Sequence, residues 1–193
     1  MEYLTQLYAL SINPIWDELI KLRQKTRDIL IEYWLTETLF SFNWWLLLTS
    51  TIVFIIIWLI ILDKKRIIEI AFFGLLVGTT TFILDTIGIT LVWWSYPDRV
   101  IPIIPPIIEI HKVHLPIIYM IIYQYFKNWK SFLVSVSFAS FIFSFVFEPL
   151  TVWLGIYEVY HWKYIYSFPI YILGGLMLRW VIIKAKHIER NYG

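Results

Sequence analysis

Asp85, Glu109 and Glu148 each lie within a long apolar stretch of the sequence. A charged side chain in hydrocarbon costs about 2.5–3.5 kcal/mol or more, so such groups normally face the protein interior and find partners there. Carboxyl groups that crowd together cannot all ionise at low cost, so at least one is expected to hold a proton at neutral pH. A proton on a buried acid is what general acid catalysis requires. We therefore treat these three acids as candidate catalytic residues.

Two histidines, His111 and His114, follow Glu109 closely, and we expect them to be binding residues of the same site. Histidines and a carboxylate together are chemically suited to hold a metal ion. Their spacing here is not diagnostic, so we predict neither a metal nor a cofactor. The chain has no cysteine, which excludes a thiolate nucleophile and a thiolate metal site.

Aromatic residues make up 20% of the chain, and the face of an aromatic ring attracts positive charge. We expect some of these rings to line an apolar cavity beside the acids and to stabilise a developing carbocation. The candidates are Tyr119, Phe138, Phe141, Phe145, Trp153 and Trp162. Of these, Tyr119, Trp153 and Trp162 are the predicted binding residues.

The depth of the three acids in a membrane permits two interpretations. Counted at about 1.5 Å per helical residue, Asp85, Glu109 and Glu148 lie roughly 26–27 Å from the cytoplasmic ends of their helices. They therefore fall at one level in the outer half of a hydrocarbon core of roughly 30 Å. There they either converge on a shared cavity or extend into headgroup water.

The composition points to the bilayer. Of 193 residues, 60% are apolar and only 16% are charged, whereas soluble domains have roughly 45–50% apolar and about 25% charged residues. Disordered chains and disulfide scaffolds are excluded by the same figures. No basic tract interleaves with aromatic residues, so we expect no nucleic-acid partner. The expected partner is membrane lipid.

Five apolar segments predict an all-α integral membrane protein with five transmembrane helices. The segments cover about residues 44–62, 67–94, 100–126, 131–157 and 164–183, within a bundle domain of residues 44–193 that ends in a short cytoplasmic tail. The third helix is irregular because prolines crowd its start, at Pro102, Pro105, Pro106 and Pro116. Only 115–126 is typical of a regular helix, and the first half is extended, re-entrant or a broken helix.

Residues 1–43 form a separate N-terminal segment with a different composition. Asn13 and Pro14 are a typical helix start, and apolar residues then recur at helical spacing opposite a charged face. The pattern predicts an amphipathic helix that lies on the membrane surface or packs as a lid over the bundle.

The distribution of lysine and arginine predicts the orientation. Residues 63–66, residues 127–130 and the tail after residue 183 hold eight of them, against only Arg99 and Lys163 in the opposite connections. The side rich in positive charge should be cytoplasmic. We predict a multi-pass cell-membrane protein with its N-terminus outside and its C-terminus in the cytoplasm.

Two segments share the order acid, glycine, tryptophan, tyrosine, proline. One runs from Asp85 to Pro97 and the other from Glu148 to Pro169. Helix ends at an outer interface gather Trp and Tyr in any case, and we favour that explanation over an internal repeat.

The chain resembles a family of small multi-spanning membrane proteins from spore-forming Gram-positive bacteria. The resemblance covers about residues 85–183 and rests on residues 123–132, 147–149, 154–157, 161–164 and 166–171. It implies a bacterial cytoplasmic membrane and no particular activity. The pattern of Asp85, Gly88, Trp93 and Pro102 is also similar to the small membrane-embedded lycopene cyclase domains, whose acids are thought to protonate an isoprenoid. Those domains have paired acids after proline, where this sequence has Glu109 alone.

Two functions remain open from the sequence. The first is an enzyme that modifies an isoprenoid or another lipid inside the bilayer by acid catalysis. The second is a non-enzymatic component, such as a transporter subunit or a scaffold. Five helices are few for a carrier, so the second function requires a homo-oligomer, for which the amphipathic helix and the pair Gly74 and Gly78 offer contact surfaces.

Overall fold

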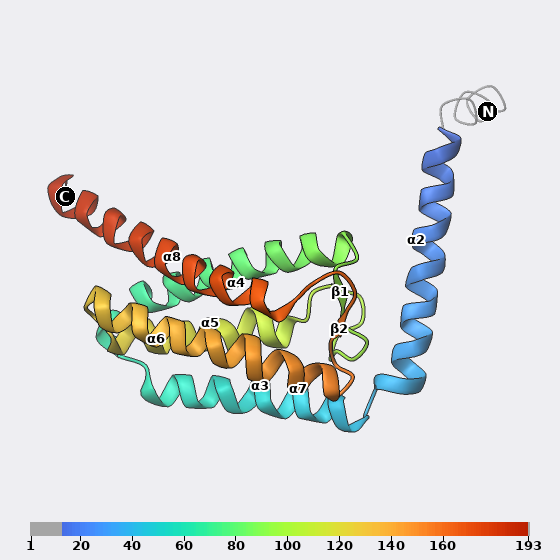
Figure 1. The fold of residues 1–193 in the computed structure, drawn as a ribbon, viewed down its shortest axis with the longest axis horizontal. Helices are drawn as coiled ribbons and strands as arrows, with labels where there is room; N and C mark the ends of the chain where they lie inside the picture. Colours follow the sequence, from blue (N-terminus) through green and yellow to red (C-terminus); the bar gives the residue numbers. More distant parts are fainter. Residues whose placement is uncertain (1–12, 193) are drawn as a thin grey trace.

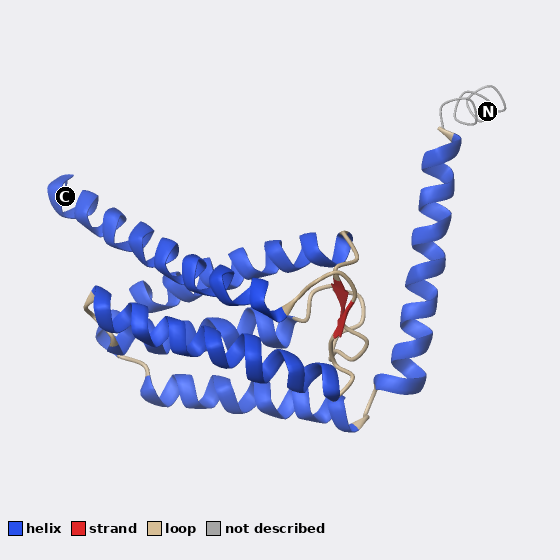
Figure 2. Ribbon diagram, in the orientation of Figure 1, coloured by secondary structure: helices blue, strands red, loops and turns tan. Residues whose placement is uncertain are grey.

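Helices make up most of the computed structural model, which describes residues 13–192 (Figure 2). The helical elements are α2 (Pro14–Tyr33), η1 (Trp34–Thr38), α3 (Phe42–Ile61), η2 (Lys64–Arg66), α4 (Ile67–Thr90), η3 (Glu109–His114), α5 (Leu115–Tyr125), α6 (Trp129–Ile142), η4 (Phe143–Phe147), α7 (Glu148–Trp153) and α8 (Tyr164–Tyr192). Two short strands, β1 (Trp94–Ser95) and β2 (Glu158–Val159), pair in antiparallel fashion. The predicted all-α class is confirmed.

Four helices in the described part of the chain are long and apolar enough to cross a membrane. They are Phe42–Ile61, Lys64–Thr90, Trp129–Trp153 and Tyr164–Asn191, and they indicate a membrane protein. The predicted third helix is shorter. Residues 101–107 form turns without a regular helix, and the helical part begins with the π-helical turn η3 and continues as α5.

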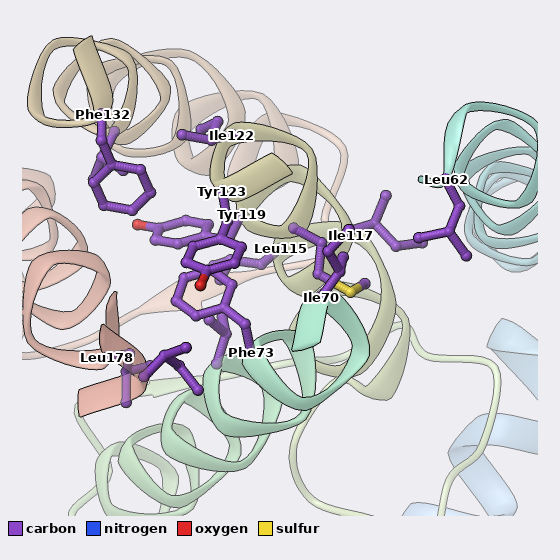
Figure 3. Packing of buried hydrophobic residues seen from close by; sticks show 14 of the residues in the cluster. Leu62, Ile70, Phe73, Leu115, Ile117, Tyr119, Ile122, Tyr123, Phe132 and Leu178 are labelled. Atoms are coloured by element: carbon purple, nitrogen blue, oxygen red, sulfur yellow. The ribbon is translucent and has the colours of Figure 1, made fainter. Parts of the chain in front are cut away.

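The core of the bundle lies where α4 packs on α5 (Figure 3). Phe73 on α4 is fully buried and stacks on Tyr123 of α5, with the ring centres 4.4 Å apart. A Cβ atom at Gly74 would overlap the side chain of Met120, and one at Gly78 would lie 3.2 Å from Pro116 Cγ. The two glycines therefore let α5 approach α4 within the same chain, so this surface is not free to bind a second copy.

The links between helices gather at two opposite ends of the bundle. At one end, Gln124 Nε2 at the end of α5 donates to Ile61 O at the end of α3, 2.8 Å away, and Lys186 Nζ on α8 pairs with Glu69 Oε2 at 2.9 Å. At the other end, Asn43 Nδ2 donates to Leu154 O, 2.7 Å away. The pair η3–α5 thus runs the length of the bundle alongside the longer helices.

The helix α2 stands clear of the bundle and runs crosswise to its helices, next to the end that carries β1 and β2 (Figure 1). None of its residues is buried, and Ile15 and Trp16 are exposed. Its attachment lies in η1, where Trp34 Nε1 donates to Arg99 O, 2.9 Å away. The helix therefore does not form a lid over the bundle.

Alanine substitutions at two neighbouring glycines of α8 are expected to change stability in opposite directions. A Cβ atom at Gly174 would meet no atom within 4 Å, whereas one at Gly175 would lie 2.7 Å from the ring of Tyr119. Gly174→Ala should raise the free energy of unfolding by about 0.5–1 kcal/mol, because alanine loses less backbone entropy in a helix. Gly175→Ala should lower it by about 1–3 kcal/mol through overpacking. Thermal unfolding in detergent compares the two, and equal shifts would contradict this packing.

Candidate functional site

A cavity of about 230 Å³ lies near the end of the bundle that carries the two strands. Its walls come from α4, η3, α5, α7, α8 and the segments around β1 and β2, and apolar surface dominates them. Of the residues predicted from the sequence, the cavity brings together Asp85, His111, Tyr119, Glu148 and Trp162. The two acids come from α4 and α7, which are far apart in the chain.

Asp85 is buried and uses its two oxygen atoms differently. Oδ1 accepts hydrogen bonds from Trp94 Nε1 and from the hydroxyl of Tyr96, both at 2.7 Å. Oδ2 has no hydrogen-bond partner among the described residues and lies 3.4 Å from His111 Nδ1. His111 Nδ1 also lies 3.1 Å from Ile107 O. The hydrogen bonds to Asp85 therefore all lie on Oδ1, and Oδ2 is left beside the His111 ring.

A sharp turn after α4 brings Trp94 back onto the helix that carries Asp85. Val92 has a φ of 55°, a left-handed conformation that is rare for a β-branched residue. Strain of this kind persists only where the surrounding structure holds it. Gly88 provides the space, because a Cβ atom there would overlap the Trp94 indole. The turn and the glycine together place the indole N–H on Asp85.

Tyr96 is held by the segment that follows β1. Arg99 is buried, and its guanidinium donates to the carbonyls of Tyr96, Ile104 and Pro105 at 2.6, 3.2 and 3.1 Å. Burial raises the pKa of Tyr96 well above its usual value, and the carboxyl group of Asp85 raises it further. Tyr96 therefore remains a neutral phenol that donates its proton to Asp85 in a hydrogen bond.

Glu148 accepts a hydrogen bond on each oxygen from α8. The hydroxyl of Tyr171 donates to Oε1 at 2.9 Å, and the hydroxyl of Ser167 donates to Oε2 at 3.1 Å. Ser167 Oγ accepts in turn from Trp162 Nε1 at 2.9 Å. Each acid thus has one tyrosine donor, and each is connected to one indole, directly for Asp85 and through Ser167 for Glu148.

Two polar residues of the cavity, His111 and Glu148, lie at π-helical turns. His111 lies within η3, and Glu148 follows η4 directly, with Pro149 next to it. A proline cannot donate a backbone hydrogen bond, and π-helical turns often occur at functional sites. The helix is therefore irregular just before Pro149, where the widened turn η4 precedes Glu148 at the cavity.

The paired strands tie the two acid-bearing segments together. Trp94 in β1 lies opposite Val159 in β2, and Trp93 stacks on Trp162 with ring centres 5.4 Å apart. Tyr96 stacks on Tyr157 at 5.3 Å. These rings form the wall of the cavity nearest the strands.

Three of the predicted site residues lie elsewhere. Glu109 does not line the cavity, and its Oε1 accepts from Val100 N at 3.2 Å. His114 packs edge-on against Phe54, with ring centres 4.5 Å apart. Trp153 is 80% exposed on the surface of the bundle. The expected convergence of three acids is therefore reduced to two, and the expected binding set loses His114 and Trp153.

The remaining aromatic candidates are not cavity residues either. Phe138 and Phe141 are exposed on α6, and Phe145 packs against Phe168. Four residues that hold the acids were not predicted from the sequence: Trp94, Tyr96, Ser167 and Tyr171. Trp94 and Tyr96 stood in the repeated order of acid, glycine, tryptophan and tyrosine, which was a usable signal.

The site offers two carboxyl groups and one imidazole in an apolar, aromatic enclosure. Among the described residues, no cluster of three or more histidine, cysteine, aspartate or glutamate side chains is arranged to hold a metal ion. The geometry suits proton transfer by carboxyl groups. Comparison with protein-family models, with curated proteins and with solved structures finds no match for this chain.

Proposed function

We propose that this protein is an enzyme of the bilayer that transfers a proton from a carboxyl group to a carbon–carbon double bond of an isoprenoid or another unsaturated lipid. One observation carries the proposal. Asp85 and Glu148 line the same apolar, aromatic cavity among helices of membrane-spanning length. A buried acid beside a cavity that excludes water is suited to protonate a weak base such as an alkene.

Asp85 is the proposed proton donor because its Oδ2 has no hydrogen-bond partner among the described residues. The proton on Oδ2 forms a C–H bond with one alkene carbon, and the other alkene carbon becomes a carbocation. The rings of Trp94, Trp162 and Tyr119 present electron-rich surfaces around that charge. Loss of a proton from a neighbouring carbon to Glu148 then restores a double bond. The net result is a shifted double bond, or a closed ring where a second double bond of the lipid first attacks the carbocation. Proton exchange with water then returns a proton to Asp85 and removes one from Glu148, so no redox partner is needed.

We further propose that five segments cross the membrane, with η3–α5 as the third, and that the β1–β2 end faces outward. Lysine and arginine concentrate at the other end of the bundle. The crosswise position of α2 at the β1–β2 end is consistent with a helix that lies on the outer membrane surface (Figure 1).

The absence of cysteine makes this orientation directly testable. Lys163→Cys lies in the segment before α8 and Lys64→Cys lies between α3 and α4, and both lysines are exposed. In intact cells, a membrane-impermeant maleimide should label Lys163→Cys at least about tenfold more than Lys64→Cys, because the bilayer shields the inner face. Permeabilised cells should label both equally. The reverse preference in intact cells would overturn the orientation.

Deuterium transfer tests the enzymatic function. The purified protein in lipid nanodiscs is incubated in D2O with unsaturated isoprenoids, and carbon-bound deuterium is measured by mass spectrometry. We expect time-dependent incorporation with the unmodified chain and none with the double variant Asp85→Asn and Glu148→Gln. Incorporation by the double variant at the rate of the unmodified chain would refute acid catalysis at this cavity.

A further inference from the structure

The cavity is elongated along the two helices that form its longest walls. On α4 its lining extends from Val77 to Ile87, and on α8 it extends from Ser167 to Leu178. At about 1.5 Å per helical residue, each wall is about 15 Å long. The shape is a slot parallel to the helices rather than a round chamber.

The two ends of this slot differ in polarity. Asp85, Glu148 and Ser167 lie toward the end near the strands, while Val77, Gly174 and Leu178 lie toward the opposite end. Asp85 is 3% exposed, and its Oδ2 has no hydrogen-bond partner among residues 13–192. The slot therefore combines a polar end that has an unused acceptor with an apolar far end.

The slot opens sideways between α4 and α8. Three of its lining residues, Leu84, Ile87 and Ile170, are 46%, 46% and 40% exposed. All three are apolar and lie on helices of membrane-spanning length, which places this opening on the surface of the bundle that a bilayer would surround. Gly174 widens the slot, because the space at its Cβ position is empty to 4 Å.

We propose that the slot binds one hydrocarbon chain of a bilayer lipid, which enters between α4 and α8. Its polar or reactive end lies at Asp85 and its tail runs past Gly174 toward Leu178. A volume of about 230 Å³ along walls of about 15 Å leaves room for one chain, and the walls match an apolar tail along most of their length. As the substrate class of an enzyme, this lipid rests on the proposed function. Its binding to the slot can be tested without any proton transfer.

Photolabelling tests the proposal with two probes, a polyprenol and an unbranched fatty alcohol, each with a diazirine at the end of the tail. The full chain in nanodiscs is irradiated with and without excess unlabelled alcohol, and labelled residues are mapped by mass spectrometry. We expect saturable labelling around Gly174 and Leu178 on α8 and around Val77 on α4. A diazirine placed next to the hydroxyl should label Trp94 or Trp162 instead. The better-captured probe identifies the chain as branched or unbranched.

Gly174→Leu fills the tail end of the slot and should reduce saturable labelling at least tenfold. Leu173→Phe adds bulk at the next position of α8, where Leu173 is 65% exposed and outside the cavity, and should change labelling less than twofold. Unchanged thermal unfolding of Gly174→Leu excludes misfolding as the cause. Saturable labelling that Gly174→Leu leaves intact, or that maps only to lipid-facing residues, would overturn the inference.

The two proposals fail in different ways. If the chain is captured and Gly174→Leu blocks it, but no deuterium is transferred, the slot binds a lipid and the enzymatic function is wrong. If deuterium transfer proceeds equally in Gly174→Leu and in the unmodified chain, the tail does not occupy this slot and only the present inference is wrong.

Discussion

Asp85→Asn is expected to reduce deuterium transfer by about 10²–10⁴-fold, the range that general acid catalysis contributes. Asparagine has nearly the same shape as aspartate but cannot deliver a proton. Its Oδ1 still accepts from Trp94 Nε1 and the Tyr96 hydroxyl, which lie 2.7 Å from this position. The free energy of unfolding should therefore change by no more than about 1 kcal/mol, because both hydrogen bonds remain.

Two further amide variants separate the role of Asp85 from a general effect of charge. Glu148 already accepts a hydrogen bond on each oxygen, so Glu148→Gln should reduce the transfer less than Asp85→Asn does, by about 10²-fold, the low end of the range for general acid–base catalysis. Glu158→Gln removes an exposed carboxyl group of β2 and should leave the rate unchanged within twofold. Initial rates in D2O measure all three. Equal losses in Asp85→Asn and Glu148→Gln would contradict the assignment of Asp85 as the donor.

A third substitution, Asp85→Leu, tests how much Asp85 contributes to stability as a hydrogen-bond acceptor. Leucine leaves the Trp94 indole N–H and the Tyr96 hydroxyl without their acceptor in a buried place. Each buried unpaired donor costs about 1–3 kcal/mol. We expect both Asp85→Asn and Asp85→Leu to lose activity, but only Asp85→Leu to lose stability. This result would show that the loss of activity comes from the missing proton and not from altered packing.

The long helices were predictable because hydrocarbon imposes a strong and simple constraint on sequence. A run without charge that is about 20 residues long can hardly be anything but a membrane helix, and the first predicted segment, 44–62, nearly coincides with α3 (Phe42–Ile61). Beyond the predicted fifth segment, 164–183, α8 continues as a helix through the charged tail to Tyr192. Charge marks where a helix leaves the membrane and does not end the helix itself.

The sequence predicted how far along its helix each site residue lies, but not which side of the helix carries it. Counting residues along a helix gives the level of a side chain, and this placed Asp85 and Glu148 together. It gives no account of which side of the helix faces the core, which depends on packing between elements. Glu109 is an example of a residue at the expected level that does not face the cavity. Prolines precede it and it begins a π-helical turn, so its side chain does not point where a regular helix would direct it.

The partners of the acids were beyond sequence reasoning for a related reason. Tyr171 and Ser167 meet Glu148 only because one face of α8 packs against α6 and η4, and nothing local in the sequence selects that face. Trp94 meets Asp85 because the chain reverses at Val92, whose left-handed conformation is unusual for valine. Tertiary packing enforces both arrangements.

Gly88→Ala should lower the free energy of unfolding by about 2–4 kcal/mol, although it adds a single methyl group to a helix. The new Cβ atom would overlap the Trp94 indole, so the ring must move away from α4. The cost combines overpacking of about 1–3 kcal/mol with the loss of the hydrogen bond from Trp94 Nε1 to Asp85 Oδ1. Gly174→Ala is the matched control, because it adds the same methyl group to α8 in open space.

A double-mutant cycle with Trp94→Ala identifies the cause of this loss. If the methyl group acts by displacing the indole, Gly88→Ala should cost little once the indole is absent, and the two substitutions should couple by about 1–3 kcal/mol. Thermal unfolding of the four proteins in one detergent measures the coupling. Additive effects would mean that Gly88 is not what allows Trp94 to reach Asp85. Since deuterium transfer depends on the same hydrogen bond to hold Asp85, its rate should also fall in Gly88→Ala.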